Sequence, residues 1–199
     1  ALGVMAILAI DLGTDLMPAL ALGAEPPEPG MMDRPPRRRK DHIVNRALLA
    51  RAYLLLGGVQ SVAVMTVFIG WFWAHGYWGQ ILDLPDEGAV YHQAVSMALA
   101  TVVFTQVGNL FAQRAEHSSI RQVGLFTNRL VWVGIASEIA IVAFIVYAPV
   151  MQRVIDTGPL PLLSWFWLLP LVPLLPLADG VRKTVTRWRR PRSEEVLAT

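Results

Sequence analysis

Cysteine is absent from the 199-residue chain, and charged side chains make up only 16% of it. The missing thiols exclude a disulfide scaffold, a thiolate metal site and a cysteine nucleophile. Hydrophobic residues make up 54%, whereas ordinary soluble domains have about 45–50% apolar and about 25% charged residues. The chain therefore carries more apolar surface than one water-soluble core can bury, which argues against a soluble enzyme domain.

A positively charged segment is missing at the start of the chain. Residues 1–10 are almost entirely apolar, without the basic region that opens a secretory signal peptide. The sequence pI is 9.3, but the net charge is only +2 and the basic residues lie beside apolar runs. This pattern predicts contact with a membrane, and we expect no nucleic-acid partner.

Five apolar segments are long enough to cross a bilayer as helices, which takes about 20 residues. These segments are 1–23, 52–75, 94–111, 130–148 and 161–178. The other segments are 24–51, 76–93, 112–129, 149–160 and 179–199. None of them is long enough for a further domain, so we predict an all-α membrane protein built as a bundle of five transmembrane helices. The proline-rich segment 24–51 is expected to be an ordered loop, with a disordered linker as the alternative.

Lysine and arginine are distributed unevenly between the two sets of loops. Sixteen of the seventeen lie in 24–51, 112–129 and 179–199, and only Arg153 lies in the other set. By the positive-inside rule, the basic side is cytoplasmic. We therefore predict a multi-pass protein of the cell membrane with a cytoplasmic C-terminus. Five spans then leave the first residue outside and within a helix, which predicts that the chain is the C-terminal part of something larger.

The first span contains two aspartates within the apolar string AILAIDLGTDLMPALAL. Asp11, Thr14 and Asp15 lie at spacings i, i+3 and i+4, so their oxygen-bearing side chains share one helical face. Each carboxylate costs at least ~2.5 kcal/mol at the centre of a bilayer, so a compensating partner is needed. Pro18 has no N–H to bind the Thr14 carbonyl, and Gly13 weakens the helix further. The pattern predicts a broken helix with a site for a hard cation, and an ion pair with a Lys or Arg of another helix is the alternative.

Other polar residues within the spans give weaker signals. Gln106 and Asn109 are i, i+3 neighbours that can complete an oxygen shell or form hydrogen bonds between helices. Glu138 in the fourth span can be a ligand, a proton carrier or an ion-pair partner. Asp179 is expected to form a solvated ion pair with the basic residues three and four positions later.

Several strings of the sequence resemble P2-type cation-pumping ATPases. The sixth transmembrane helix of that family is similar to IDLGTDLMPALALGAE, and the loop after it is similar to GMMDRPPRRRKDHIVNRALLARAYLLLGG. Helices eight, nine and ten of the family are similar to TQVGNL, to SEIAIVAFIVYAP and to SWFWLLP with DGVRK. The resemblance covers nearly the whole chain. It implies that the five spans are helices six to ten of a ten-helix transport domain.

The resemblance also implies a set of metal ligands, namely Asp11, Thr14, Asp15, Gln106, Asn109 and Glu138. Asp11 and Gln106 have the form seen in sodium/potassium pumps, and Glu138 matches a glutamate associated with a third sodium site. Asn109 instead resembles calcium pumps, so the transported cation stays open between calcium and sodium/potassium. Pro173 and Pro176 in the last span have no functional explanation at this stage.

ATP and magnesium would, by the same resemblance, bind in domains that this sequence does not contain, so no catalytic residue is expected here. The implied partners are the lipid bilayer, helices one to five and the phosphorylation domain of the same pump. The competing hypothesis is a stand-alone five-helix membrane scaffold or passive permease without ATPase activity.

Overall fold

The computed structural model describes residues 2–26, 44–114, 124 and 126–189, and these residues form helices joined by turns, with no strand among them. Five helical segments are long and apolar enough to cross a membrane. They are Val4–Gly23, Ala50–Ala74, Ala89–Gln113, Arg129–Tyr147 and Leu162–Thr184. The predicted class, an all-α membrane protein of five spans, is confirmed. Most of the predicted loop 24–51, half of 112–129 and the end of 179–199 lie outside the described residues.

The first two spans are each assembled from three consecutive helical segments. The first consists of α1 (Val4–Ala9), the π-helix η1 (Ile10–Thr14) and α2 (Leu16–Gly23). The second consists of α3 (Arg46–Leu49), the π-helix η3 (Ala50–Gly57) and α4 (Gly58–Ala74). Its helix thus begins within the predicted loop, because hydropathy marks only the apolar part of a helix and backbone hydrogen bonds continue into the polar part.

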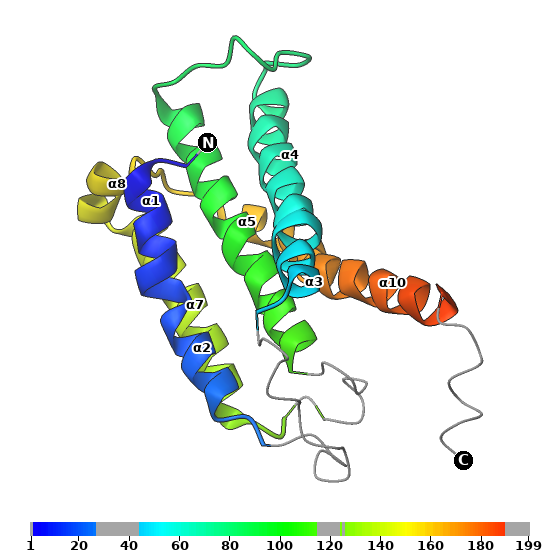
Figure 1. The fold of residues 1–199 in the computed structure, drawn as a ribbon. Coiled ribbons are helices and arrows are strands. Elements are labelled where there is room, and N and C mark those ends of the chain that lie inside the picture. Colours follow the sequence, from blue (N-terminus) through cyan, green and yellow to red (C-terminus); the bar gives the residue numbers. More distant parts are fainter. Residues whose placement is uncertain (1, 27–43, 115–123, 125, 190–199) are drawn as a thin grey trace, which may run out of the picture.

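The third span, α5 (Ala89–Gln113), is the central helix of the bundle. It is buried along most of its length, whereas less than half of each of the other four spans is buried. Figure 1 shows it between α4 on one side and α1, α2 and α7 (Arg129–Tyr147) on the other. Small residues such as Ala94 and Ala98, both fully buried, let Phe68 and Phe72 of α4 pack closely against it. The exposed outer faces carry large apolar side chains, as expected for surfaces in contact with lipid or with further helices.

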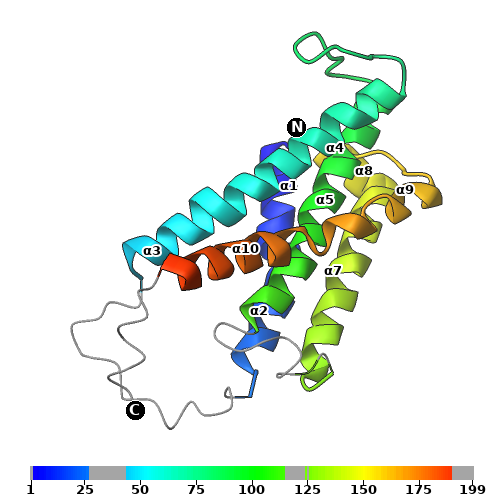
Figure 2. The same cartoon turned by 90° about the vertical axis from the view of Figure 1, so that its right-hand side faces the viewer.

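The fifth span is interrupted by prolines rather than continuous. It contains α9 (Leu162–Phe166), the 3₁₀-helix η4 (Leu169–Leu171) and α10 (Leu174–Arg189). Proline lacks the N–H that an α-helix needs for its backbone hydrogen bonds, and the span has a proline at every third position from 170 to 176, namely at 170, 173 and 176. After this break α10 crosses α5 at a steep angle in both views (Figures 1 and 2). Its helix continues to Arg189, past the predicted end of the span at residue 178.

The crossing of α5 and the fifth span depends on a glycine and a proline. A Cβ atom built on Gly108 would lie 1.7 Å from the Val172 carbonyl oxygen, so no side chain fits there. Pro176, four residues after Val172, has no N–H to bind this carbonyl as an α-helix would. The carbonyl is therefore directed at the α5 backbone, which gives Pro176 a packing role.

Candidate cation site

The broken part of the first span is a widened helical turn at Ile10–Thr14. The Asp15 N–H donates to the Ile10 carbonyl five residues earlier, at 3.2 Å, as in a π-helix. Thr14 is fully buried, and its hydroxyl donates to the same carbonyl at 2.8 Å. The predicted departure from α-helical geometry at Asp11–Asp15 is thus confirmed, and such single π-turns are frequent at functional sites.

Glycines bring α7 close to this turn. A Cβ atom on Gly134 would lie 3.3 Å from the Pro18 backbone, and one on Gly13 would lie 3.4 Å from the Ile141 side chain. Glu138 lies between these two contacts on α7, at the middle of the span Arg129–Tyr147. Its side chain is only 2% exposed. The close approach of the two helices therefore places this carboxylate in the interior, next to the broken helix.

The acidic side chains of this region face one another without a cation. Asp15 interacts electrostatically with Asp11, and Glu138 interacts electrostatically with Asp15. Within the described ranges, no lysine or arginine forms an ion pair with any of the three. Glu138 Oε2 is buried and has no hydrogen-bond partner among the residues that the structure describes. Buried carboxylates of this kind are costly, because neither solvent nor a counter-ion compensates their charge.

Gln106 and Asn109, the two predicted ligands on α5, differ in their relation to these acids. The Gln106 side chain lies close enough to Asp15 to interact with its carboxylate, while the Gln106 Oε1 atom is buried without a partner in the described part of the chain. The Asn109 side-chain oxygen instead accepts a hydrogen bond from Gln113 of the same helix, at 3.2 Å. The fold therefore brings Gln106 to Asp15, whereas Asn109 bonds along α5.

In the part of the chain that the structure describes, no three acidic, histidine or cysteine side chains converge closely enough to hold a metal ion. Asp15 lies next to Thr14 and Gln106 and interacts electrostatically with Glu138. Asp11, in contrast, is exposed. Any cation held here would therefore need neutral oxygens, such as those of Thr14 and Gln106, in addition to the carboxylates.

A groove of about 430 Å³ lies between η1, α4 and α5. Its lining is apolar except for four side chains, which are Asp11, Gln60, Ser61 and Gln106. Gln60 comes from the second span and is a residue that the sequence analysis missed. The only available signal was a single amide within an apolar helix, and nothing in the sequence indicated which neighbour it faces.

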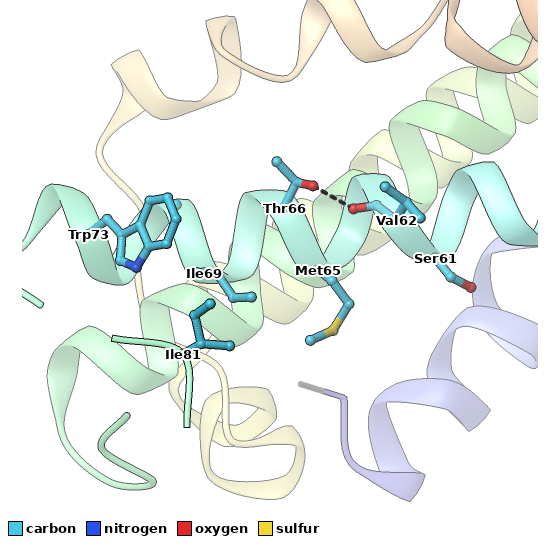
Figure 3. A pocket seen from close by; sticks show the side chains of 8 residues that line it. Ser61, Val62, Met65, Thr66, Ile69, Trp73 and Ile81 are labelled. Carbon is cyan, nitrogen blue, oxygen red and sulfur yellow. Dashed lines mark hydrogen bonds between the residues drawn. The ribbon is translucent and has the colours of Figure 1, made fainter. Parts of the chain in front are cut away.

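A second groove, of about 390 Å³, lies along another face of α4 (Figure 3) and is apolar. Ile69 of α4 and Ile81 of the following turn lie next to each other at its wall, and the Thr66 hydroxyl donates to the Val62 carbonyl of its own helix at 2.7 Å. None of its lining side chains is charged, so this groove offers no carboxylate to a cation.

The carboxylates at one end of the bundle, in contrast, are paired with arginines. We call this end, where Glu25, Arg51, Arg114 and Asp179 lie, the basic end. Arg51 binds Asp179 through two hydrogen bonds of 2.8 and 3.0 Å, with side-chain exposures of 8% and 1%. The same carboxylate also pairs with the side chains three and four residues later, Arg182 and Lys183. The predicted pairing with Arg182 and Lys183 is therefore confirmed, but its solvated character was wrong, because the fold buries Asp179 and adds a third cation from 128 residues away.

Glu25 forms the second pair of the basic end. Arg114 Nη2 lies 2.8 Å from Glu25 Oε1, and the Asn128 amide donates to Glu25 Oε2 and to the Ala21 carbonyl, each at 2.8 Å. Burial alone would raise the pKa of the Glu25 carboxyl, but these hydrogen bonds and the Arg114 charge outweigh it and hold the pKa below its ordinary value. The Asn128 side chain also caps α7 by accepting from the Leu130 N–H at 2.9 Å.

Comparison with known proteins agrees with this architecture. Residues 1–185 match the family described as "Cation transporting ATPase, C-terminus". The chain is 29% identical to potassium-transporting ATPase alpha chain 2 of Rattus norvegicus and 30% identical to the Homo sapiens protein of the same name. It is 31% identical to sodium/potassium-transporting ATPase subunit alpha-1 of Oreochromis mossambicus. Each of these matches covers 94% of the chain but only 20% of the relative, so the chain spans about one fifth of their length.

Proposed function

The chain belongs to the cation-transporting ATPase family, whose C-terminal region it matches over residues 1–185, and from this premise we propose that it is the membrane part of an ATP-driven cation pump. In this role the oxygen ligands for the transported cation come from Asp11, Thr14, Asp15, Gln106 and Glu138. Asn109 joins them in another conformation of the pump. The family match favours this function over a stand-alone scaffold or passive permease.

One observation carries the proposal: among the residues that the structure describes, the carboxylates in the middle of the spans have no cationic partner, whereas Glu25 and Asp179 at the basic end each have an arginine. A fold that places the partly buried Asp15 near the buried Glu138 needs positive charge from elsewhere. A transported cation supplies it when bound, and the widened turn of η1 supports such a site because unpaired oxygens collect around it.

The relatives favour a monovalent cation. The names of the compared proteins include potassium and sodium/potassium transport. Asp11, Gln106 and Glu138 together match that type, while Asn109 is the residue that departs from it. We therefore propose sodium or potassium as the transported ion, with calcium as the competing outcome of the experiment below.

The remaining parts of the pump are proposed partners of this chain. ATP hydrolysis with magnesium takes place in domains that the chain does not contain, and the domains drive the ion site by moving the helices. Helices one to five complete the transport domain, and lipid covers the exposed apolar faces. The basic end faces the cytoplasm by the positive-inside rule, in the cell membrane.

The test is ATPase activity of the full-length pump with Asp15→Asn, compared with wild type and with Asp83→Asn, which changes an exposed aspartate between α4 and α5. Asp15→Asn should abolish activation by the cation, while Asp83→Asn should leave it unchanged. Sodium, potassium and calcium are added separately to each protein. Normal activation of the Asp15 variant would remove the central claim, and activation by micromolar calcium without a sodium response would overturn the monovalent assignment.

A further inference from the structure

The second span contributes one polar contact to the neighbourhood of the candidate cation site. The Gln60 side-chain amide of α4 donates to the Thr105 hydroxyl of α5 at 3.1 Å and lies 3.4 Å from the Val102 carbonyl. Thr105 is fully buried, and its hydroxyl in turn lies 2.8 Å from Val102 O and 2.9 Å from Thr101 O. The Thr105 hydroxyl thus accepts from α4 and donates to its own helix, so each group in this chain of contacts has a partner.

Gln60 differs in this respect from the other polar residues nearby on α4. The Thr66 hydroxyl bonds back to its own helix, and Ser61 lies exposed at the wall of the groove. Gln60 alone of these three reaches across to α5, and it does so at the residue that precedes Gln106. Neighbouring helices in a membrane are held by close packing and by hydrogen bonds between them, so this bond adds a directional contact that helps to fix the rotation of α5 against α4.

The rotation of α5 decides where the Gln106 side chain points. Its side chain interacts with Asp15, and its buried Oε1 has no partner among the described residues. Gln60, Gln106 and Asp11 line the same groove of about 430 Å³. A rotation of α5 that released Thr105 from Gln60 would therefore also carry Gln106 away from Asp15.

We infer that Gln60 is a positioning residue for the transported cation, holding α5 so that the free oxygen of Gln106 is directed to the site beside Asp15. Gln60 acts through Thr105 and does not itself bind the ion. This inference rests on the proposed function, because it assigns a role in binding the same cation, and it adds α4 to the helices that determine the affinity.

The experiment is cation-activated ATPase of the full-length pump with Gln60→Leu, which keeps a similar volume and removes the hydrogen bond. We expect the cation concentration for half-maximal activation to rise about fivefold, which is the size of one lost neutral hydrogen bond, with the maximal rate retained. Ser61→Ala is the matched control, since it changes the neighbouring groove residue and should leave both quantities unchanged. A role in packing alone would lower the amount of folded pump without changing the half-maximal concentration, and that result would overturn the inference.

Thr105→Val tests the same contact from the other helix and answers the question even where Gln60→Leu folds poorly. Thr105→Val should raise the cation concentration for half-maximal activation by the same factor as Gln60→Leu. The double variant should raise it no further than either single variant, because both changes remove the same interaction. Independent, multiplying shifts would overturn the inference. Wild-type pump that no cation activates would instead contradict the proposed function, so the two failures are distinguishable.

Discussion

Asp179 and Glu25 at the basic end are bound by arginines at 2.8 Å, whereas Asp15 and Glu138 in the middle of the spans have no positive partner in the described part of the chain. Both pairs of residues carry carboxylates, and both pairs are largely shielded from solvent. At the basic end, the fold compensates each carboxylate with its own side chains, so the charges tie helices together permanently. In the middle, the compensating charge is left to be supplied from elsewhere, which is what a site for a transported cation requires.

Among the changes that test this contrast, Arg51→Leu is expected to have the largest effect on the free energy of unfolding. The change leaves the Asp179 carboxylate, 1% exposed, without the two hydrogen bonds of its buried partner. We expect a loss of about 3 kcal/mol in unfolding free energy, near the lower end for a broken buried pair because Arg182 and Lys183 still contact the carboxylate. Thermal unfolding of the detergent-solubilised pump measures it, with the exposed Arg153→Leu as control. Equal stability of the two variants would contradict a structural role for this pair.

Asn128→Ala should have the next largest effect. It removes the α7 cap and the two hydrogen bonds to Ala21 and Glu25, so we expect a loss of about 2 kcal/mol, the upper end for a capping residue. Asn45→Ala is the matched control, because its side chain makes only the exposed cap to Leu48 N at 2.8 Å. The same unfolding measurement should give a smaller loss for the control. If Asn45→Ala lowered the free energy of unfolding as much as Asn128→Ala, the hydrogen bonds from Asn128 to Ala21 and Glu25 would contribute nothing.

Glu138→Gln should change stability in the opposite direction. The neutral amide removes a buried like charge from the surroundings of Asp15, so we expect a gain of about 1 kcal/mol in the absence of transported cation. Glu87→Gln, at an exposed position between α4 and α5, should be neutral. Unfolding is measured in choline buffer, which contains no transported cation. A clear loss of stability in the Glu138 variant would mean that this carboxylate has a positive partner after all.

The smallest effect concerns the pH dependence contributed by Glu25. Because its folded-state pKa lies below the ordinary value of 4.5, its stabilising contribution is fully present above that pH and is lost as the pH falls through the lowered pKa. Wild type should exceed Glu25→Gln by less than about 1 kcal/mol, since the carboxylate is partly exposed. Unfolding midpoints from pH 7 to pH 3 should show a constant difference above pH 4.5 that shrinks below it. A difference that grows with acid would contradict this linkage.

The parts of the site that could be predicted lie close together along the chain. Asp11, Thr14 and Asp15 are neighbours in sequence, and Gly13 with Pro18 marks the place where the helix departs from α-helical geometry, although the structure widens it into a π-turn instead of breaking it. The binding role of these residues, and of Gln106, Asn109 and Glu138, stays a prediction. The contact of Gln60 with Thr105, 45 residues away, could not be derived, because an apolar helix with one amide does not indicate which neighbour that amide faces.

The sequence by itself determined that the chain has five segments able to cross a membrane, since the length and apolar content of each segment do not depend on its neighbours. Only the tertiary structure decided which charges are neutralised. Glu25 meets Arg114 across 89 residues and Asp179 meets Arg51 across 128, and both pairings depend on how the helices are rotated and packed. The same packing, through Gly134 and Gly13, brings Glu138 beside Asp15, and no arginine of the described segments pairs with either. Hydropathy fixes where a helix lies along the chain, but the rotation of one helix against another depends on contacts that no single segment contains.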